Sequence, residues 1–157
     1  MRILLAVFIS LLCCSVPGKA QFLQREDPSS IYEYQANNYA LTVKVLPESD
    51  TLYIFRFKDD RYPSLTELAS FWMRPQELVA FVDGLADLQK PENLKRETAI
   101  DINSRGRIKN LQVGNTMQTI IEARDKSGIL KGYTTMPAFV IDALRNAVYA
   151  YLKGSAK

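Results

Sequence analysis

Residues 43–60 read VKVLPESDTLYIFRFKDD, and residues 108–125 read IKNLQVGNTMQTIIEARD. Aligned without gaps, the two stretches share a lysine, a leucine, a threonine and the final aspartate, and Val43 and Ile108 differ only within the aliphatic class. In both stretches a short turn-forming segment lies between two runs with the composition of strands. The chain is therefore predicted to contain the same β-hairpin twice.

The residues around each hairpin extend it into a longer unit. Turn residues separate further runs that are rich in β-branched and aromatic side chains. Strands are predicted at 31–37, 40–46, 51–58 and 66–73 in the first half, and at 97–102, 105–112, 116–125 and 129–135 in the second.

A helix is predicted after the fourth strand of each half, over 75–89 and 137–153. Each begins with a proline, which suits the first helical turn because an N–H at that position has no partner in the helix. Each helix also has one apolar stripe at helical spacing, enough to cover one face of a sheet. We therefore predict one compact α+β domain of two ββββα repeats, 31–90 and 91–157, whose antiparallel sheets are each covered by one helix.

The N-terminal segment MRILLAVFISLLCCSVPGKA has the three parts of a secretory signal peptide. A basic residue precedes the apolar run at 3–14, and small residues precede a predicted cleavage site between Ala20 and Gln21. The apolar run is shorter than the roughly 20 residues that span a bilayer. We therefore expect a signal peptide at 1–20, a flexible leader at 21–30, and an exported protein, periplasmic or extracellular, without a stable membrane anchor.

The chain that remains after signal removal lacks the side chains on which most catalytic and metal sites depend. The sequence has no histidine, and its two cysteines, Cys13 and Cys14, leave with the predicted signal. This composition excludes zinc sites, Ser–His–Asp triads and Cys–His pairs. We therefore expect no metal, no cofactor and no catalytic residue. A hydrolase that works with carboxylates alone is kept as a third alternative.

Both predicted helices follow a strand through a proline, in the segments SFWMRPQELVAFVDGL and GYTTMPAFVIDAL. These two joints, the order of the elements and the internal repeat resemble the Whirly and PUR-repeat group of single-stranded nucleic-acid-binding proteins, whose fold is a ββββα unit in duplicate. The resemblance covers residues 31–153. It implies the fold and, as one alternative, nucleic-acid binding. Members of that group act inside cells and organelles, whereas this chain carries a predicted export signal.

Strand alternation predicts what the helix-free face of the first sheet carries. A four-residue turn at 47–50 would place Leu46 opposite Thr51. The face toward the helix would then carry Leu41, Val43, Val45, Leu52 and Ile54. The helix-free face would carry Thr42, Lys44, Tyr53, Phe55 and Phe57.

In the second repeat the same register would place Leu111 opposite Thr116. The equivalent face would be basic instead of aromatic. It would carry Arg105, Arg107, Lys109, Gln118, Ile120, Glu122 and Arg124, and Lys131 and Tyr133 of the last strand would extend it.

These two faces favour a non-catalytic binding or interaction module that presents its helix-free sheet faces to an unknown protein or polymer. Aromatic rings beside cations also suit single-stranded nucleic acid, whose bases stack and whose phosphates need positive charge. Another alternative stays open, in which Tyr53, Phe55 and Phe57 form a core layer between the two halves or the contact of a homodimer.

Overall fold

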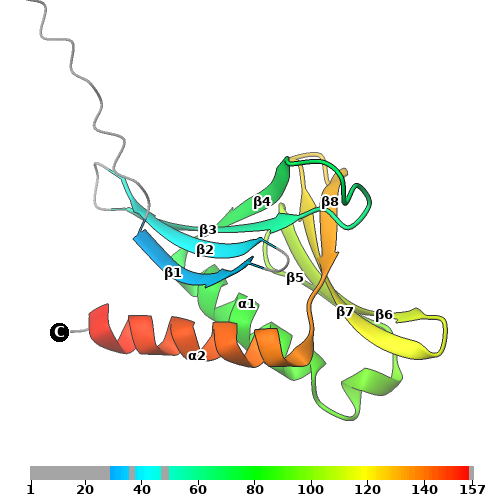
Figure 1. Ribbon diagram of the computed structural model, residues 1–157. Coiled ribbons are helices and arrows are strands. Elements are labelled where there is room, and N and C mark those ends of the chain that lie inside the picture. Colours follow the sequence, from blue (N-terminus) through cyan, green and yellow to red (C-terminus); the bar gives the residue numbers. More distant parts are fainter. Residues whose placement is uncertain (1–28, 36–37, 47–49, 156–157) are drawn as a thin grey trace, which may run out of the picture.

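The computed structural model describes residues 29–35, 38–46 and 50–155 (Figure 1). The predicted signal peptide and residues 21–28 of the predicted leader lie outside the described residues. The first repeat contains β1 (Ser29–Tyr34), β2 (Tyr39–Val45), β3 (Thr51–Lys58), β4 (Leu68–Met73) and α1 (Pro75–Leu88). A short 3₁₀ helix, η2 (Asn93–Lys95), leads into the second repeat. That repeat contains β5 (Thr98–Asp101), β6 (Gly106–Val113), β7 (Thr116–Arg124), β8 (Leu130–Thr135) and α2 (Ala138–Ser155).

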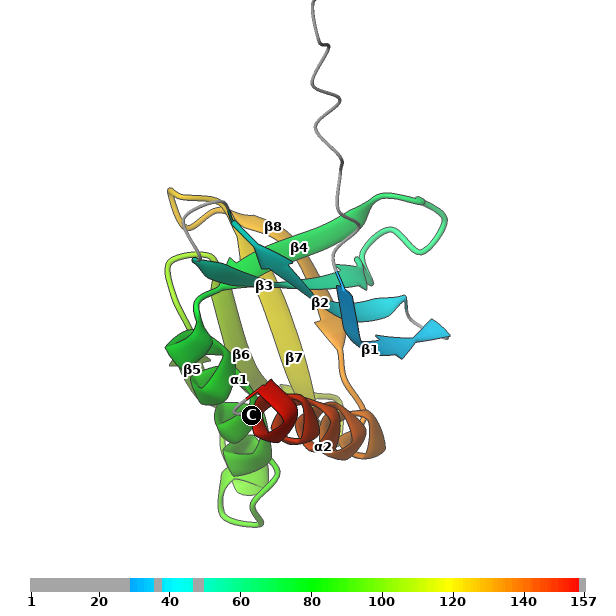
Figure 2. The same cartoon turned by 90° about the vertical axis from the view of Figure 1, so that its left-hand side faces the viewer.

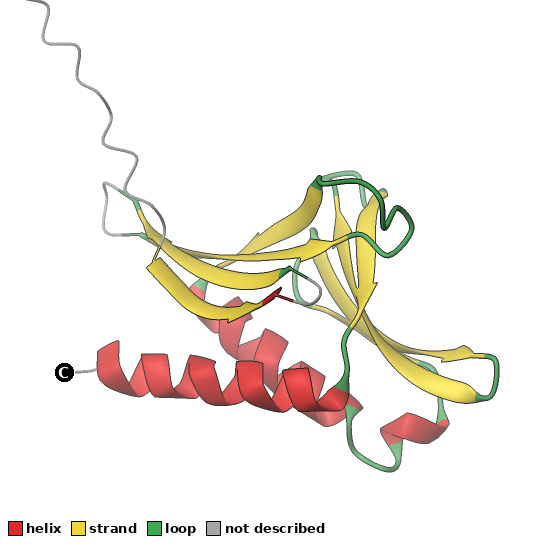
Figure 3. Cartoon of the chain, viewed as in Figure 1, coloured by secondary structure: helices red, strands yellow, loops and turns green. Residues whose placement is uncertain are grey.

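The predicted α+β fold of two ββββα repeats is confirmed. The strands form two four-stranded sheets in the orders β1-β2-β3-β4 and β5-β6-β7-β8, and neighbouring strands in both are antiparallel. The sheets meet at an angle along β4 and β8, and the two helices lie in the angle between them (Figures 2 and 3). The outer face of each sheet is left free of helices.

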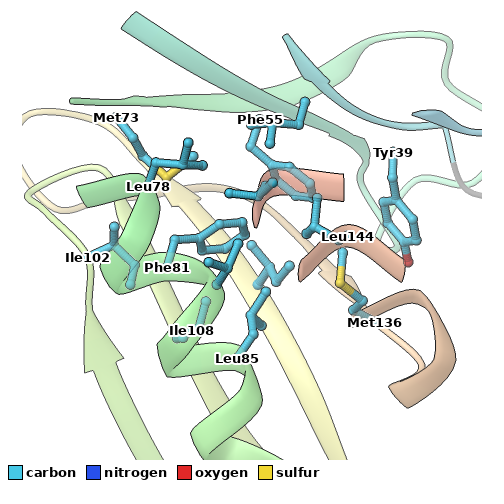
Figure 4. Close-up of a cluster of buried hydrophobic side chains, with 14 of the residues drawn as sticks. Tyr39, Phe55, Met73, Leu78, Phe81, Leu85, Ile102, Ile108, Met136 and Leu144 are labelled. Atoms are coloured by element: carbon cyan, nitrogen blue, oxygen red, sulfur yellow. The ribbon is translucent and has the colours of Figure 1, made fainter. Parts of the chain in front are cut away.

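The helices join the two repeats into one core. α1 contacts β3 and β4 of its own sheet but also β6 of the other, and α2 packs against α1 and against β1 of the first sheet. At the centre, the rings of Phe55, Phe71 and Phe81 lie 5.2 to 5.9 Å apart, from β3, β4 and α1. Figure 4 shows Phe55 and Phe81 in this cluster. Leu85 and Ile108 extend this cluster toward the second sheet.

α1 is anchored to the second repeat along its whole length. At its middle, Gly84 lets the helix lie so close to β6 that an added Cβ would be 2.8 Å from Cδ1 of Ile108. At its C-terminal end, the amide of buried Asn110 donates to the carbonyl oxygen of Leu88 at 2.8 Å. This bond satisfies one of the carbonyl groups that every helix leaves unpaired at its end. The oxygen of the same amide accepts a hydrogen bond from Thr119 Oγ1 at 2.8 Å.

The β3–β4 loop seals the outer edge of β8. The N–H of Asp60 donates to the carbonyl of Tyr133 at 2.9 Å, and the N–H of Thr135 donates to the Asp60 carboxylate at 2.7 Å. Arg61 donates to the Lys131 carbonyl at 2.5 Å and also forms an ion pair with Asp59. The loop therefore pairs groups that an edge strand otherwise leaves open to another chain. Asp59 is buried in this loop although it is charged, and its ion pair with Arg61 compensates for the burial.

The predicted faces of the first sheet are correct for Leu41, Val43, Thr42 and Lys44 of β2 but wrong for β3, where Leu52 and Ile54 lie on the outer face instead of facing the helices. Val45 pairs with Thr51, so five residues rather than four separate the paired positions of β2 and β3. A slip of one residue moves every side chain of a strand to the other face. The side chains of Tyr53, Phe55 and Phe57 accordingly face the helices, with 5%, 0% and 0% of their surfaces exposed.

The predicted faces of the second sheet are correct although the predicted register is not. Val113 pairs with Thr116 across Gly114 and Asn115, which moves the register by two residues from the predicted pairing of Leu111 with Thr116. An even slip keeps each side chain on its face. Gly114 has a φ of 61°, which suits the first central position of a two-residue hairpin turn.

Replacing Gly132 with alanine is expected to destabilise the protein by about 1–3 kcal/mol. An added Cβ on this residue of β8 would be 2.5 Å from the Cβ of Ala69 on β4, and neither backbone can move away without separating the sheets. Urea unfolding followed by circular dichroism measures the change. Gly154→Ala is the matched control, because nothing lies within 4 Å of the added atom there. Equal unfolding midpoints for the two variants would contradict the close contact.

Candidate binding face

The outer face of the second sheet brings together three of the predicted basic residues and pairs them with two carboxylates. Glu122 lies between Lys109 and Arg124, with carboxylate oxygens 2.5 Å from Lys109 Nζ and 2.5 Å from an Arg124 nitrogen. Arg107 forms a two-bond ion pair with Asp101. These cations share a face as predicted, but each has an acidic partner.

Glu122 is only 4% exposed although it lies on the helix-free face. Burial raises the pKa of this carboxyl group, but hydrogen bonds from Lys109 and Arg124, together with their charges, more than offset that effect. The pKa of Glu122 is therefore lowered from its ordinary value, and the group stays ionised. The three side chains form a charge cluster in which both cations are held on one carboxylate, so only one net positive charge remains.

Of the other residues predicted for this face, Tyr133 lies next to the cluster, whereas Lys131 and Arg105 do not belong to it. Lys131 Nζ lies 3.7 Å from the Asp125 carboxylate. Tyr133 is opposite Glu122 on β8 and half-buried. Arg105 is not on the face at all, because it lies in the loop before β6, where its guanidinium carbon is 5.2 Å from the centre of the Trp72 ring.

The outer face of the first sheet has the opposite character. We call its outward side chains on β2, β3 and β4 the binding face. Its apolar middle combines Ile54 of β3 with Trp72 opposite it on β4, and Trp72 is 40% exposed. The members of the binding face are Thr42, Lys44, Leu52, Ile54, Arg56, Lys58, Leu68, Ser70 and Trp72.

The cations of the binding face have no acidic partner among the described residues. Strands β2, β3 and β4 contain no aspartate or glutamate. Glu33 of the edge strand β1 lies on the same side, opposite Ala40, but forms no ion pair within the described residues. No ion pair within the described ranges involves Lys44, Arg56 or Lys58. Arg56 reaches only the hydroxyl of Thr42, at 3.4 Å, and its Nε is buried without a hydrogen-bond partner in the described structure. Since a buried donor without an acceptor is costly, this arginine is held in place by packing rather than by pairing.

Lys44 is the predicted site residue that the binding face retains. Tyr53, Phe55 and Phe57, which were predicted to lie beside it, are in the core, and the exposed ring is that of Trp72, which was not among the predicted site residues. Alternation in β4 could have found it, because Trp72 stands between two apolar residues, Phe71 and Met73, that are both buried.

Replacing Glu122 with glutamine is expected to make stability less dependent on pH. Its folded-state pKa is lower than the ordinary 4.5, so its ionised form contributes stability that is present above that value and lost as the pH falls through the folded-state pKa. At neutral pH, Glu122→Gln should cost about 1–3 kcal/mol, because Lys109 and Arg124 lose their charged partner. Unfolding free energies measured in urea from acid to neutral pH test this. Glu67→Gln, which removes an exposed carboxylate, should follow the parent protein, and parallel curves for all three proteins would contradict the role of Glu122.

The described residues provide neither a metal cluster nor a helix that could cross a membrane. Within them, no three aspartate, glutamate, histidine or cysteine side chains are grouped so that they could hold a metal ion. Neither described α-helix is both long and apolar enough to cross a bilayer. In comparisons with known proteins, no protein-family model matches the chain, and no curated protein matches it.

Proposed function

We propose that the protein is a non-catalytic binding module, and that its partner is an anionic polymer lying across the binding face. One observation carries this proposal. The cations of this face lack acidic partners among the described residues, whereas the cations on the equivalent face of the second sheet are paired with acids. The proposed export signal at 1–20 would present the binding face to the periplasm or to the cell exterior.

Charge that is not neutralised within the fold is available to a partner. Lys44 lies opposite Leu52, near the start of β3, and Lys58 is the last residue of β3. Arg56 lies between these two positions, so the three cations form a row along β3. A row of this kind matches a chain that carries repeated negative charges, because each contact releases counterions and strengthens binding at low salt. A globular partner with a single acidic group would use only part of the row.

Single-stranded nucleic acid is the anionic polymer that the apolar middle of the face favours. Trp72 is half-exposed beside Ile54 and Leu52, and a flat apolar surface next to cations is what unpaired bases and their phosphates need. The resemblance of the fold to Whirly and PUR-repeat proteins supports the same candidate. The stacking ring would be Trp72, since the rings first expected to stack are in the core.

Self-association is the alternative use of the same surface. An apolar patch with a half-exposed tryptophan can also be covered by a second copy of the chain. Repulsion between the unpaired lysines of the two copies would oppose such a homodimer, which is why we favour an anionic partner. Sedimentation of the purified protein at low and high salt separates the two, because screening promotes the dimer and weakens the polymer complex.

The purified protein is expected to bind a labelled oligo-dT at low salt, and to bind it more tightly than polyphosphate, which has the charges but no bases. The affinity should fall steeply with salt, with a slope of about −0.7 per phosphate contacted. The double variant Lys44→Gln/Lys58→Gln should bind both polymers more weakly and show a smaller slope, and Trp72→Ala should lose the preference for oligo-dT.

The control variant is Lys95→Gln/Lys153→Gln, which removes the same charge from exposed positions on η2 and α2. It should bind oligo-dT like the parent protein. Equal weakening in the two double variants would mean that net charge alone drives the binding. No binding to either polymer at micromolar protein would exclude the proposed function.

A further inference from the structure

An open pocket of about 200 Å³ lies beside the binding face, where the β4–α1 joint meets the loop between β5 and β6. The pocket is separate from the row of Lys44, Arg56 and Lys58, although Trp72 belongs both to the binding face and to the pocket lining. The pocket is lined by Trp72, Arg74, Glu77, Asn103, Ser104 and Arg105.

Asn103 fixes the shape of this pocket. Its Nδ2 donates to the carbonyl of Trp72 at 3.0 Å and to the Glu77 carboxylate at 3.1 Å. Its side-chain oxygen accepts hydrogen bonds from the N–H groups of Arg105 and Gly106, both at 2.9 Å. One side chain thus ties the loop to the start of α1 and holds the loop in its turn. The pocket is preformed, and a ligand would not have to order the loop on binding.

The charge of the pocket lining favours a ligand with one negative charge. Arg74 and Arg105 contribute two positive charges, and no ion pair in the described ranges involves either of them. Glu77 contributes one negative charge. Its Oε2 already accepts from the N–H of Arg74 at 2.8 Å and from Asn103. Because this carboxylate occupies the start of α1, the helix end itself is not available to an anion, and attraction must come from the two guanidinium groups.

The stacking of Arg105 on Trp72 adds a preference for a planar ligand. A guanidinium group that lies flat against a ring keeps its N–H edge free for a carboxylate, which it can bind through two parallel hydrogen bonds. The exposed part of the Trp72 ring offers a surface for a second ring. The volume is below the 300–1,000 Å³ typical of sites for drug-sized ligands, so the pocket suits a single ring with one charged group.

We propose that this pocket binds a small aromatic carboxylate, with its ring on Trp72 and its carboxylate on Arg105 and Arg74. The inference does not rest on the proposed function, because it concerns a small molecule and uses neither Lys44 nor Lys58, although both would use the ring of Trp72. It assigns to Arg105, which the sequence grouped with the polymer-binding cations, a different ligand and a different place.

The protein provides its own reporter, because Trp72 is its single tryptophan. Benzoate is the probe, and it should change the tryptophan emission saturably with a dissociation constant in the millimolar range or below. Acetate, which has the charge without the ring, and benzyl alcohol, which has the ring without the charge, should each bind at least about tenfold more weakly. Phenyl phosphate should bind more weakly than benzoate, because its second negative charge is unfavourable beside Glu77.

Arg105→Ala should weaken benzoate binding about tenfold or more, through the loss of a charge-assisted hydrogen bond. Arg145→Ala is the matched control, because Arg145 is also an arginine next to a ring, with its guanidinium carbon 5.7 Å from the centre of the Tyr149 ring on α2. Calorimetry should give the same constants, which guards against a direct effect of Arg105 on the emission. Circular dichroism of each variant checks that it is folded.

Equal binding of acetate and benzoate, or unchanged benzoate binding in Arg105→Ala, would overturn the inference. So would the absence of any saturable change with benzoate. The variant Lys44→Gln/Lys58→Gln keeps the outcome separate from that of the proposed function. It should bind benzoate like the parent protein even where its binding to oligo-dT is lost.

Discussion

The fold depends on the position of α1 between the two sheets. This helix belongs to the first repeat, yet both of its ends are hydrogen-bonded to the second, through Glu77 to Asn103 and through the Leu88 carbonyl to Asn110. Gly84 between them removes the side chain that would hold the helix away from β6. α2 completes the arrangement by packing on β1 of the first sheet and on α1. Because each repeat buries apolar surface that the other provides, neither sheet has a complete core without both helices.

Placing both helices inside leaves both outer faces open, and the two faces have diverged in charge. On the second sheet Glu122 gathers Lys109 and Arg124 into a charge cluster. On the first sheet no acidic residue stands in β2, β3 or β4, so the positive charge there remains uncompensated in the described structure. The duplicated architecture thus provides one face that serves mainly as a stable surface and one that can hold an anionic partner. The pocket at Trp72 lies where the first of these sheets meets the loop that docks on α1.

The sequence predicts the elements of this fold well and the direction of the side chains less well. The repeat, the eight strands, both helices and the prolines that begin them follow from local composition and periodicity, and all are found close to the expected positions. Which face of the sheet a side chain occupies depends instead on the number of residues in the hairpin turn. One residue between Val45 and Thr51 was enough to move Phe55 from the predicted surface to the core, whereas an error of two residues between Val113 and Thr116 changed no face. Packing across the repeats was not predictable either, because an apolar stripe does not indicate which sheet it covers. Trp72 was therefore missed together with the pocket that it lines.

The helix of each repeat contacts a strand of the other repeat, so the stability of each half depends on the presence of the other. Two units that each cover apolar surface of the other resemble the subunits of an obligate dimer. As separate chains they would hold together only above a threshold concentration, since the stability of an obligate pair depends on mass action. Joining them through the segment around η2 makes that association intramolecular. A protein built in this way can be diluted without losing its partner half, and its two outer surfaces are free to evolve different chemistry because they are no longer constrained to be identical.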